Sequence, residues 1–301
     1  MLNRCLFLLI SLFFLFSSSL QAQEQMNLSS MERSLVSMQK EILKTDNDSV
    51  RQYLNLHFKE KLKAAIELPG SFSYPFDSLK KLAKLISQDK KFRIYNWNVP
   101  LSNGSNLYFC FFQIPEKNNE ARYKIIELRD RSDSIPEPEH SNLSSTNWYG
   151  ALYYKLITEK TDNGKIYTLL GWKGKDLTEM QKIIEIVTFD ENDQPHFGKA
   201  LFNKYKGGQN KRVIFRYSPV SSMVLRYEQQ TIILGKKWNA AQKKFNESHS
   251  KVSMIVCDRL VETATTESKT PVMIPAGDVY DGFLFDKGRW NFIEGVDVRN
   301  K

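Results

Sequence analysis

The fold is decided by residues 148–172, which read WYGALYYKLITEKTDNGKIYTLLGW. On both sides of the centre, apolar and polar side chains alternate with the period of two that is typical of a β-strand. The two runs, 148–160 and 165–172, are joined through Asp162-Asn163-Gly164. Asn-Gly is a preferred pair for a tight hairpin turn because both of its residues accept a positive φ. We therefore expect an antiparallel hairpin at the centre of the chain.

Strand-like runs continue on both sides of this hairpin, from residue 91 to the C-terminus. They lie at 92–97, 106–114, 121–128, 212–217, 223–227, 231–234, 252–258, 279–285 and 289–296, and 177–189 is expected to be a turn followed by a strand. Asp286-Lys287-Gly288 predicts a three-residue hairpin loop before the last strand. Connections this short make neighbouring strands antiparallel. Such a meander must bury one face, either by curling into a barrel or by packing as two sheets.

Two segments interrupt the strand pattern. Residues 132–146 are polar and contain Pro136 and Pro138, which predicts a surface loop and the best candidate for disorder in the chain. Residues 238–250 are expected to form an inserted polar loop or a short helix.

Before residue 90 the apolar residues follow the helical period. Ser29 and Glu32 have the spacing of a capping box at the start of one helix, and a second apolar stripe runs over residues 50–66. Asp77-Ser78 predicts a third helix over residues 77–88, lying against the sheet. The expected fold class is α+β, with N-terminal helices packed beside a mostly antiparallel, meandering β-sheet. We divide the chain into residues 1–22, a helical segment 23–90 and a β region 91–301, the last two forming one compact unit.

Residues 1–22 are expected to be a cleavable secretory signal peptide. Arg4 supplies a short positive region, residues 5–16 are an apolar run, and Ala22 is the small residue needed before the cut. An uncut anchor is the alternative, although the run is shorter than the roughly 20 residues that span a bilayer. No later stretch of the sequence is apolar for long enough to cross a membrane. We expect a soluble mature chain in the periplasm, at the cell surface or outside the cell.

The charge balance of the chain is basic. Lys and Arg number 43 against 34 Asp and Glu, which gives a formal net charge of +9. The cations are scattered, and solubility alone is a sufficient explanation for them. Outside the cell a basic surface also suits an anionic glycan or an acidic envelope protein. A nucleic acid partner is not expected, because the sequence contains no recognised nucleic-acid-binding module.

Two cysteines, Cys110 and Cys257, lie beyond the predicted signal peptide, each in an apolar run. An oxidising compartment permits a disulfide between them. Free cysteine is also among the most buried residue types and packs as a small apolar side chain. We expect two buried, unpaired thiols, with the disulfide as the alternative.

No local motif predicts a catalytic, metal or cofactor site. The sequence has no G-x-S-x-G elbow, and Leu169 and Asp176 occupy positions at which a phosphate-binding loop needs Gly and Ser or Thr. Residues 190–193 resemble the start of a calcium loop, but Pro195 stands in place of the turn glycine, so a plain turn is expected. The histidines lie far apart along the chain and form no zinc motif: His57, His140, His196 and His249.

Several stretches have a familiar order and spacing. Residues 74–79, 91–98, 167–172, 182–185 and 290–300 resemble a group of uncharacterised exported proteins of Bacteroidetes-type bacteria. The resemblance covers roughly residues 70–300. It implies a location in the periplasm or at the cell surface, and no activity or site residue.

Three functional classes remain open. We favour a non-catalytic binding or interaction module for a glycan, a peptide or a partner protein. One alternative is a hydrolase of envelope polysaccharide whose carboxylates, Asp258, Asp278 and Asp281, come together only in the folded chain. The other is a structural component of an envelope assembly. The tryptophans are expected to be core or rim residues of the sheet: Trp97, Trp148, Trp172, Trp238 and Trp290.

Overall fold

The computed structural model describes residues 26–162, 164–239, 244–263 and 271–298; of residues 120, 232–239 and 244–249 it describes the backbone only. The predicted signal peptide lies outside these residues, so its cleavage stays a prediction. Within the described part of the chain, no helix combines the length and the apolar character needed to cross a membrane.

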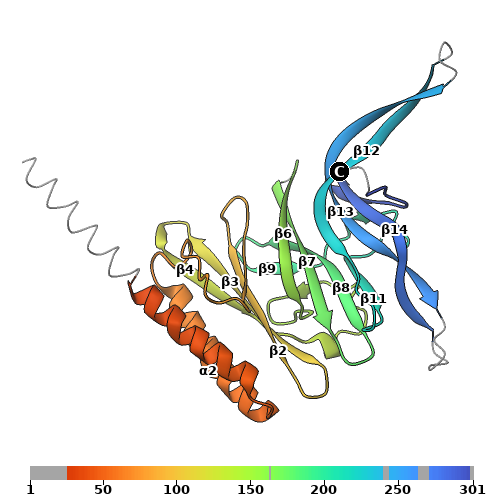
Figure 1. The fold of residues 1–301 in the computed structure, drawn as a ribbon. Helices are drawn as coiled ribbons and strands as arrows, with labels where there is room; N and C mark the ends of the chain where they lie inside the picture. Colours follow the sequence, from red (N-terminus) through yellow and green to blue (C-terminus); the bar gives the residue numbers. More distant parts are fainter. Residues whose placement is uncertain (1–25, 163, 240–243, 264–270, 299–301) are drawn as a thin grey trace, which may run out of the picture.

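Two N-terminal helices precede three mostly antiparallel sheets (Figure 1). The first helix is described over residues 26–44, and α2 spans Asp48–Glu67. The four-stranded sheet has the order β1 (Ala83–Ile86), β2 (Arg93–Pro100), β3 (Asn106–Glu116), β4 (Asn119–Leu128).

The six-stranded sheet has the order β5 (Leu143–Ser144), β9 (Pro195–Phe197), β8 (Met180–Phe189), β7 (Gly164–Gly174), β6 (Leu152–Thr161), with β11 (Arg212–Tyr217) also paired to β8. The five-stranded sheet has the order β10 (Phe202–Asn203), β15 (Arg289–Ile293), β14 (Val272–Asp286), β13 (Lys244–Thr263), β12 (Leu225–Asn239). Among these strands only β10 and β15 pair in parallel. None of the sheets formed by the described strands closes into a barrel. The α+β expectation is confirmed, and the layered sheets are consistent with its sandwich form.

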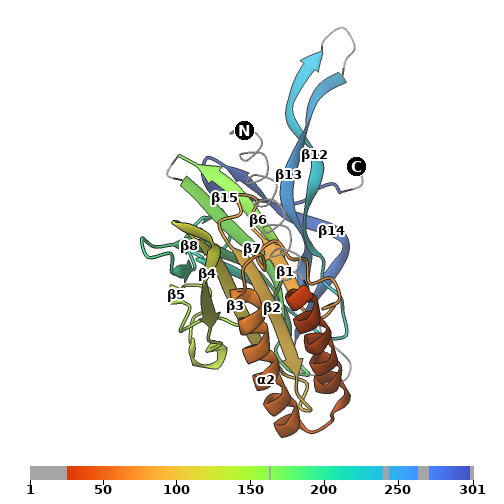
Figure 2. The same ribbon diagram turned by 90° about the vertical axis from the view of Figure 1, so that its left-hand side faces the viewer.

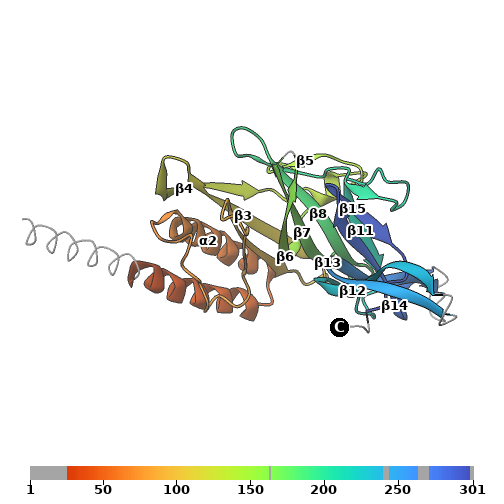
Figure 3. The same cartoon turned by 90° about the horizontal axis from the view of Figure 1, so that it is seen from above.

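Alternation along the strands sorts successive side chains into different layers. In β2, Tyr95 packs towards the helices while Ile94 packs towards the six-stranded sheet. In β7, Leu169 packs towards the four-stranded sheet while Leu170 packs towards the five-stranded sheet. Figures 1 and 3 show the resulting succession of helices, four-stranded, six-stranded and five-stranded sheets. A fully buried large apolar side chain contributes roughly 1.5–3 kcal/mol, so these cores supply most of the cohesion between layers.

Buried polar side chains fix how the layers are aligned. Trp97 Nε1 donates to Asn55 Oδ1 at 2.8 Å, which joins β2 to α2. Asn96 Nδ2 donates to the Ala151 carbonyl at 3.1 Å and joins the four-stranded to the six-stranded sheet. Trp290 Nε1 donates to Thr168 Oγ1 at 3.0 Å and joins the five-stranded to the six-stranded sheet. Each bond is directional, so each allows only one alignment of the two layers it connects.

The predicted third helix, residues 77–88, is wrong. The Leu79 and Leu82 amides bond three residues back, to Phe76 and Leu79, in successive short turns, and β1 follows as an edge strand on β2. Leu79 and Leu82 are buried beneath the helices as their spacing indicated. Pairing with β2 satisfies the backbone of residues 83–86, and this long-range gain outweighs the local helical pattern.

The segment after β4 is not the free loop that its composition predicted. It contains a 3₁₀ turn, Ser132–Ser134, and the short strand β5. Ile135 and Leu143 are buried between the four-stranded and six-stranded sheets. The prolines therefore shape a packed connection.

Residues 238–250 also differ from the expectation of a loop or short helix. The predicted strands 223–227 and 231–234 merge into β12, which pairs with β13 as far as Asn239 and Lys244. Figure 2 shows this hairpin extending well beyond the rest of its sheet. The polar sequence suggested a loop, but each strand satisfies the backbone hydrogen bonds of the other.

The remaining hairpin predictions hold, with one change in loop length. The central hairpin forms between β6 and β7, where Thr161 faces Gly164. The final loop contains two residues because Asp286 pairs with Arg289. Lys287 and Gly288 both have a positive φ, of 50° and 77°, as a tight hairpin turn requires.

The expectation for the cysteines is confirmed. Cys110 in β3 and Cys257 in β13 are buried and unpaired, and they belong to different cores. Burial raises the pKa of both thiols, which keeps them neutral and unreactive in the folded protein.

Candidate functional site

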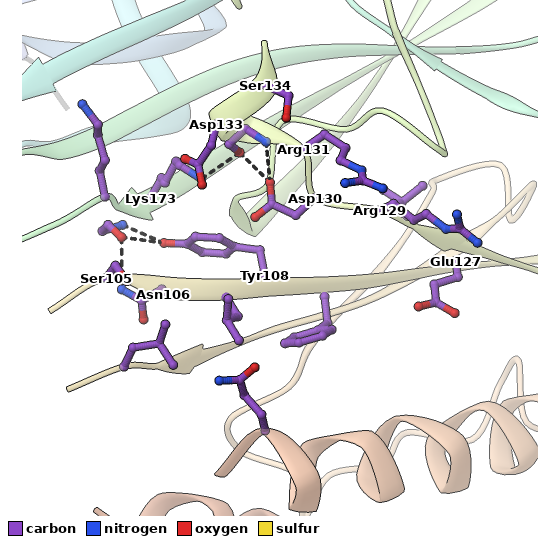
Figure 4. Close-up of a pocket in the computed structure, with 18 residues that line it drawn as sticks. Ser105, Asn106, Tyr108, Glu127, Arg129, Asp130, Arg131, Asp133, Ser134 and Lys173 are labelled. Carbon is purple, nitrogen blue, oxygen red and sulfur yellow. Dashed lines mark hydrogen bonds between the residues drawn. The ribbon is translucent and has the colours of Figure 1, made fainter. Parts of the chain in front are cut away.

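A cavity of about 610 Å³ opens between the start of β3, the segment 129–134 after β4 and the end of β7 (Figure 4). The two sheets bring these segments together, since β3 lies in the four-stranded sheet and β7 in the six-stranded sheet. We call it the Lys173 pocket, after the residue on its floor.

Lys173 is a buried cation, only 6 % exposed. Its Nζ donates to Ser132 Oγ and to the Gly150 carbonyl, both at 2.9 Å. It also lies 4.5 Å from the ring centre of Tyr108 and 5.1 Å from that of Tyr149. Burial lowers the pKa of Lys173, whereas the nearby Asp130 and Asp133 carboxylates act against that shift. The two acceptors and two aromatic rings stabilise the charged form.

Asp130 holds the other side of the pocket floor. Its Oδ1 accepts from the Ser132 amide at 3.0 Å, the Ser132 hydroxyl at 2.5 Å and the Gly150 amide at 3.1 Å. A Cβ on residue 150 would lie 2.2 Å from Asp130 Oδ2, so this position needs glycine.

The contact between Ser132 and Lys173 has the length of a serine–lysine catalytic pair, but Lys173 is the hydrogen-bond donor in it and not the acceptor. A lysine that activates a serine must be neutral and accept the hydroxyl proton. Here the Ser132 hydroxyl donates to Asp130 Oδ1 while Lys173 donates to Ser132 and Gly150. The arrangement is a satisfied polar floor that holds the pocket open.

The rim of the pocket carries unpaired positive charge. Arg129 and Arg131 are exposed, line the cavity, and have guanidinium groups without a hydrogen-bond or ion-pair partner among the described residues. Lys175, also on the rim, is paired with Glu179 at 3.5 Å. A free guanidinium is suited to bind a carboxylate, sulfate or phosphate through two parallel hydrogen bonds.

The three carboxylates proposed from the sequence do not line one site. Asp258 and Asp281 line a second cavity of about 400 Å³, whereas Asp278 lines a third with Asp297. Residues 276–279 of β14 face a single β13 residue, Arg259, and so bulge out of the pairing, which carries Asp278 away.

Both carboxylates of the second cavity are already engaged. Asp281 forms an ion pair with Arg259, with 3.0 Å from Nε to Oδ2, and accepts from the Gly295 amide at 3.0 Å. Asp258 accepts from the Val224 amide at 2.7 Å, and burial raises the pKa of this carboxyl.

The metal-binding and tryptophan candidates considered from the sequence form no ligand site among the described residues. Within the described part of the chain, no three His, Cys, Asp or Glu side chains are arranged to hold a metal ion. Asp190 accepts from the backbone amides of Asn192 and Gln194, so the calcium-like stretch is the turn that Pro195 predicted. Trp97, Trp148 and Trp290 are buried and Trp172 is half-buried, as expected for core and rim; the Trp238 side chain lies outside the description.

Sequence reasoning missed the Lys173 pocket itself, although one signal was present. Leu169 and Lys173 lie an even number of residues apart on β7 and so share a face, and Leu169 is buried there. A lysine at a core-facing position of a strand needs buried partners. Those partners, Asp130 and Ser132, lie more than 40 positions earlier in the chain.

Comparison with known proteins adds no information about this site. The resemblance to exported proteins of Bacteroidetes-type bacteria therefore stays a prediction. No family model, no curated protein and no solved structure matches this chain.

Proposed function

We propose that this protein is an exported, non-catalytic binding module that holds an acidic, hydroxyl-rich ligand, such as an acidic glycan, in the Lys173 pocket. The observation that carries the proposal is the pair of unpartnered guanidinium groups, Arg129 and Arg131, on the rim of a cavity of about 610 Å³.

The polar floor supports this choice of ligand. The hydroxyl groups of Ser105 and Ser134 also line the cavity, together with the apolar Leu107 and Phe109, whereas the Asn106 amide is already hydrogen-bonded to Gly174 and Asn98. Such a surface offers hydrogen bonds to sugar hydroxyls as well as apolar contacts to a sugar ring. The predicted export adds to the case, because acidic polysaccharides are abundant outside the cytoplasm.

The test is a titration with oligogalacturonate, whose carboxylates the arginines should bind, and with a neutral oligosaccharide of the same length. Replacing both arginines, Arg129→Gln with Arg131→Gln, should weaken oligogalacturonate binding by about tenfold or more, since a hydrogen bond to a charged group contributes roughly 1.5–3 kcal/mol. Binding of the wild type should also weaken with salt.

Arg122→Gln is the matched control, because Arg122 is exposed on β4, the strand that precedes Arg129, and does not line the pocket. It should bind oligogalacturonate as the wild type does. Equal affinity for the neutral oligosaccharide, or unchanged binding by the double variant, would contradict the proposal.

Two observations favour testing the hydrolase alternative. Asp258 and Asp281 line the same cavity, and burial raises the pKa of Asp258, as expected for a general acid. Turnover should be measured on a panel of envelope polysaccharides. Activity that appears in the wild type and disappears in Asp281→Ala would favour the hydrolase over the binding module.

A further inference from the structure

A second groove lies on the far side of the segment that follows β4. It consists of the cavity of about 400 Å³ that contains Asp258 and Asp281 and a neighbouring one of about 170 Å³. The two share three lining residues, Tyr205, Lys206 and Ile214. We call these two adjacent cavities together the Tyr205 groove.

One end of the groove contains an unsatisfied hydrogen-bond acceptor. Asn210 is 4 % exposed and lines the smaller cavity, and its Oδ1 has no hydrogen-bond partner in the described structure. A buried carbonyl without a donor costs free energy, so native proteins rarely retain one without a reason. Asn210 Oδ1 itself exposes less than 1 Å² of surface, so a ligand N–H or O–H would satisfy it once the Asn210 side chain turns towards the cavity.

The same end contains an uncompensated cation. Two of the three nearby carboxylates form ion pairs, Asp281 with Arg259 and Glu139 with Arg216, and the third, Asp258, accepts a hydrogen bond from the Val224 amide. Lys206 is exposed, and among the described residues the one contact of its Nζ is with the ring of Tyr205, 5.5 Å from the ring centre. A ligand bound here should therefore carry a negative charge next to its hydrogen-bond donor.

The larger cavity of the groove, which we call the slot, combines apolar side chains with the charged Arg216, Asp258, Arg259 and Asp281. Phe215, Leu260, Met273 and Phe292 line the larger cavity, with the Tyr205 ring 5.2 Å from that of Phe292. The backbone of the loop that presents Tyr205 is held in an unusual conformation, with a positive φ at Lys204 and Lys206 of 61° and 41°. Such residues cost roughly 1–3 kcal/mol each and concentrate at ligand sites.

We infer that the Tyr205 groove binds the carboxyl end of a peptide, with an apolar last side chain in the slot, its backbone N–H donated to Asn210 Oδ1 and its carboxylate bound by Lys206. A peptide terminus places a donor, an anion and an apolar group within one residue of each other, which is the order in which the groove offers their partners. This site is separate from the Lys173 pocket and does not rest on the function proposed there.

The test uses N-acetyl-alanyl-phenylalanine as the probe, titrated by calorimetry. Two matched probes each change one feature: its carboxyl-terminal amide lacks the charge, and N-acetyl-alanyl-glycine lacks the apolar side chain. Galacturonate, which shares only the carboxylate, tests whether the ligand of the Lys173 pocket also binds here. The acid should bind at least about tenfold more tightly than the amide, because the charge-assisted bond to Lys206 is lost in the amide. The glycine probe should also bind more weakly, because it leaves the slot empty.

Variants separate the groups involved. Lys206→Gln should remove the preference for the acid over the amide, whereas Lys204→Gln, an exposed lysine of the same loop that does not line the groove, should keep it. Asn210→Ala should weaken binding of both peptides while leaving the free protein at least as stable, because it removes an unsatisfied carbonyl. A purely structural asparagine would show the opposite, with lower stability and unchanged binding.

Arg131→Gln in the Lys173 pocket should leave peptide binding unchanged. The inference is overturned if acid and amide bind equally, if no peptide binds at millimolar concentration, or if galacturonate displaces the peptide from this groove.

Discussion

At the scale of single residues, we expect the largest loss of stability on substitution at the buried ion pair between β8 and β11. Arg212 Nε lies 2.7 Å from Glu185 Oε2, and the two side chains are 0 % and 1 % exposed. Arg212 also donates to the carbonyls of Pro138 and Ser141, so the pair anchors the packed segment after β4. Burial raises the pKa of Glu185, and the arginine acts against that shift.

Glu185→Leu should lower the free energy of unfolding by about 3–5 kcal/mol, because it leaves a buried guanidinium without its counter-charge. Urea unfolding measures this loss. The double variant Glu185→Leu with Arg212→Met should regain part of it, since no buried charge remains. Glu137→Gln, an exposed glutamate in the same segment, should stay within about 0.5 kcal/mol of the wild type. A loss below about 1 kcal/mol in the single variant would show that water reaches the arginine.

At the scale of elements, the turn between β1 and β2 is tied to β7 through one carboxylate. Asp89 Oδ2 accepts from Lys165 Nζ at 2.9 Å and from the Tyr167 hydroxyl at 2.8 Å. Partial burial raises the pKa of Asp89, but the hydrogen bonds from Lys165, Ser87 and Tyr167 outweigh it and hold the pKa well below its ordinary value of 3.8. The four-stranded sheet is thereby fastened to the six-stranded sheet at this turn.

The sign of the pH effect follows from that lowered pKa. A carboxyl with a lower pKa in the folded state stabilises the fold above its unfolded pKa, and the contribution is lost as the pH falls below about 4. Asp89→Asn should therefore cost about 1–2 kcal/mol at pH 7, a modest value because solvent partly screens the pair. The difference from the wild type should shrink at pH 2–3. Melting curves at both pH values provide the measurement. Asp46→Asn, at an exposed aspartate, should show no comparable change; a constant difference for Asp89→Asn across this range would rule out the linkage.

At the scale of the whole molecule, the sheets enclose separate cores, and each of two cores contains one thiol. Cys110 lies between the four-stranded and six-stranded sheets, and Cys257 lies between the six-stranded and five-stranded sheets. The thiols therefore report on the opening of different layers.

In a chain that begins at residue 23, a thiol-reactive probe should modify neither cysteine under native conditions and both after denaturation without reductant. In the single variants Cys110→Ala and Cys257→Ala, the labelling rate at low denaturant then measures each core separately. If the layers unfold as one unit, the two rates will give the same opening free energy. Labelling that requires a reductant would contradict the unpaired state.

The strands and their antiparallel order could be predicted because their signals are local. Alternation over residues 92–97 or 212–217, and the Asp162-Asn163-Gly164 turn, depend only on neighbours in the chain. The same is true of the buried thiols, whose apolar neighbours are visible in the sequence. Of the three carboxylates singled out from the sequence, Asp258 and Asp281 line one cavity, whereas Asp278 lines another because of a bulge in β14 that the sequence did not indicate.

Only the tertiary structure decided the rest. Residues 83–86 form a strand because the edge of β2 was free to accept them, although their spacing suited a helix. Residues 238–239 and 244–250 extend a hairpin because each strand provides the other's hydrogen bonds. The Lys173 pocket exists because two sheets bring Asp130, Ser132 and Lys173 together from distant parts of the chain. Local sequence determines the period of an element, whereas the partner that satisfies a buried backbone or a buried charge is found only when the layers pack.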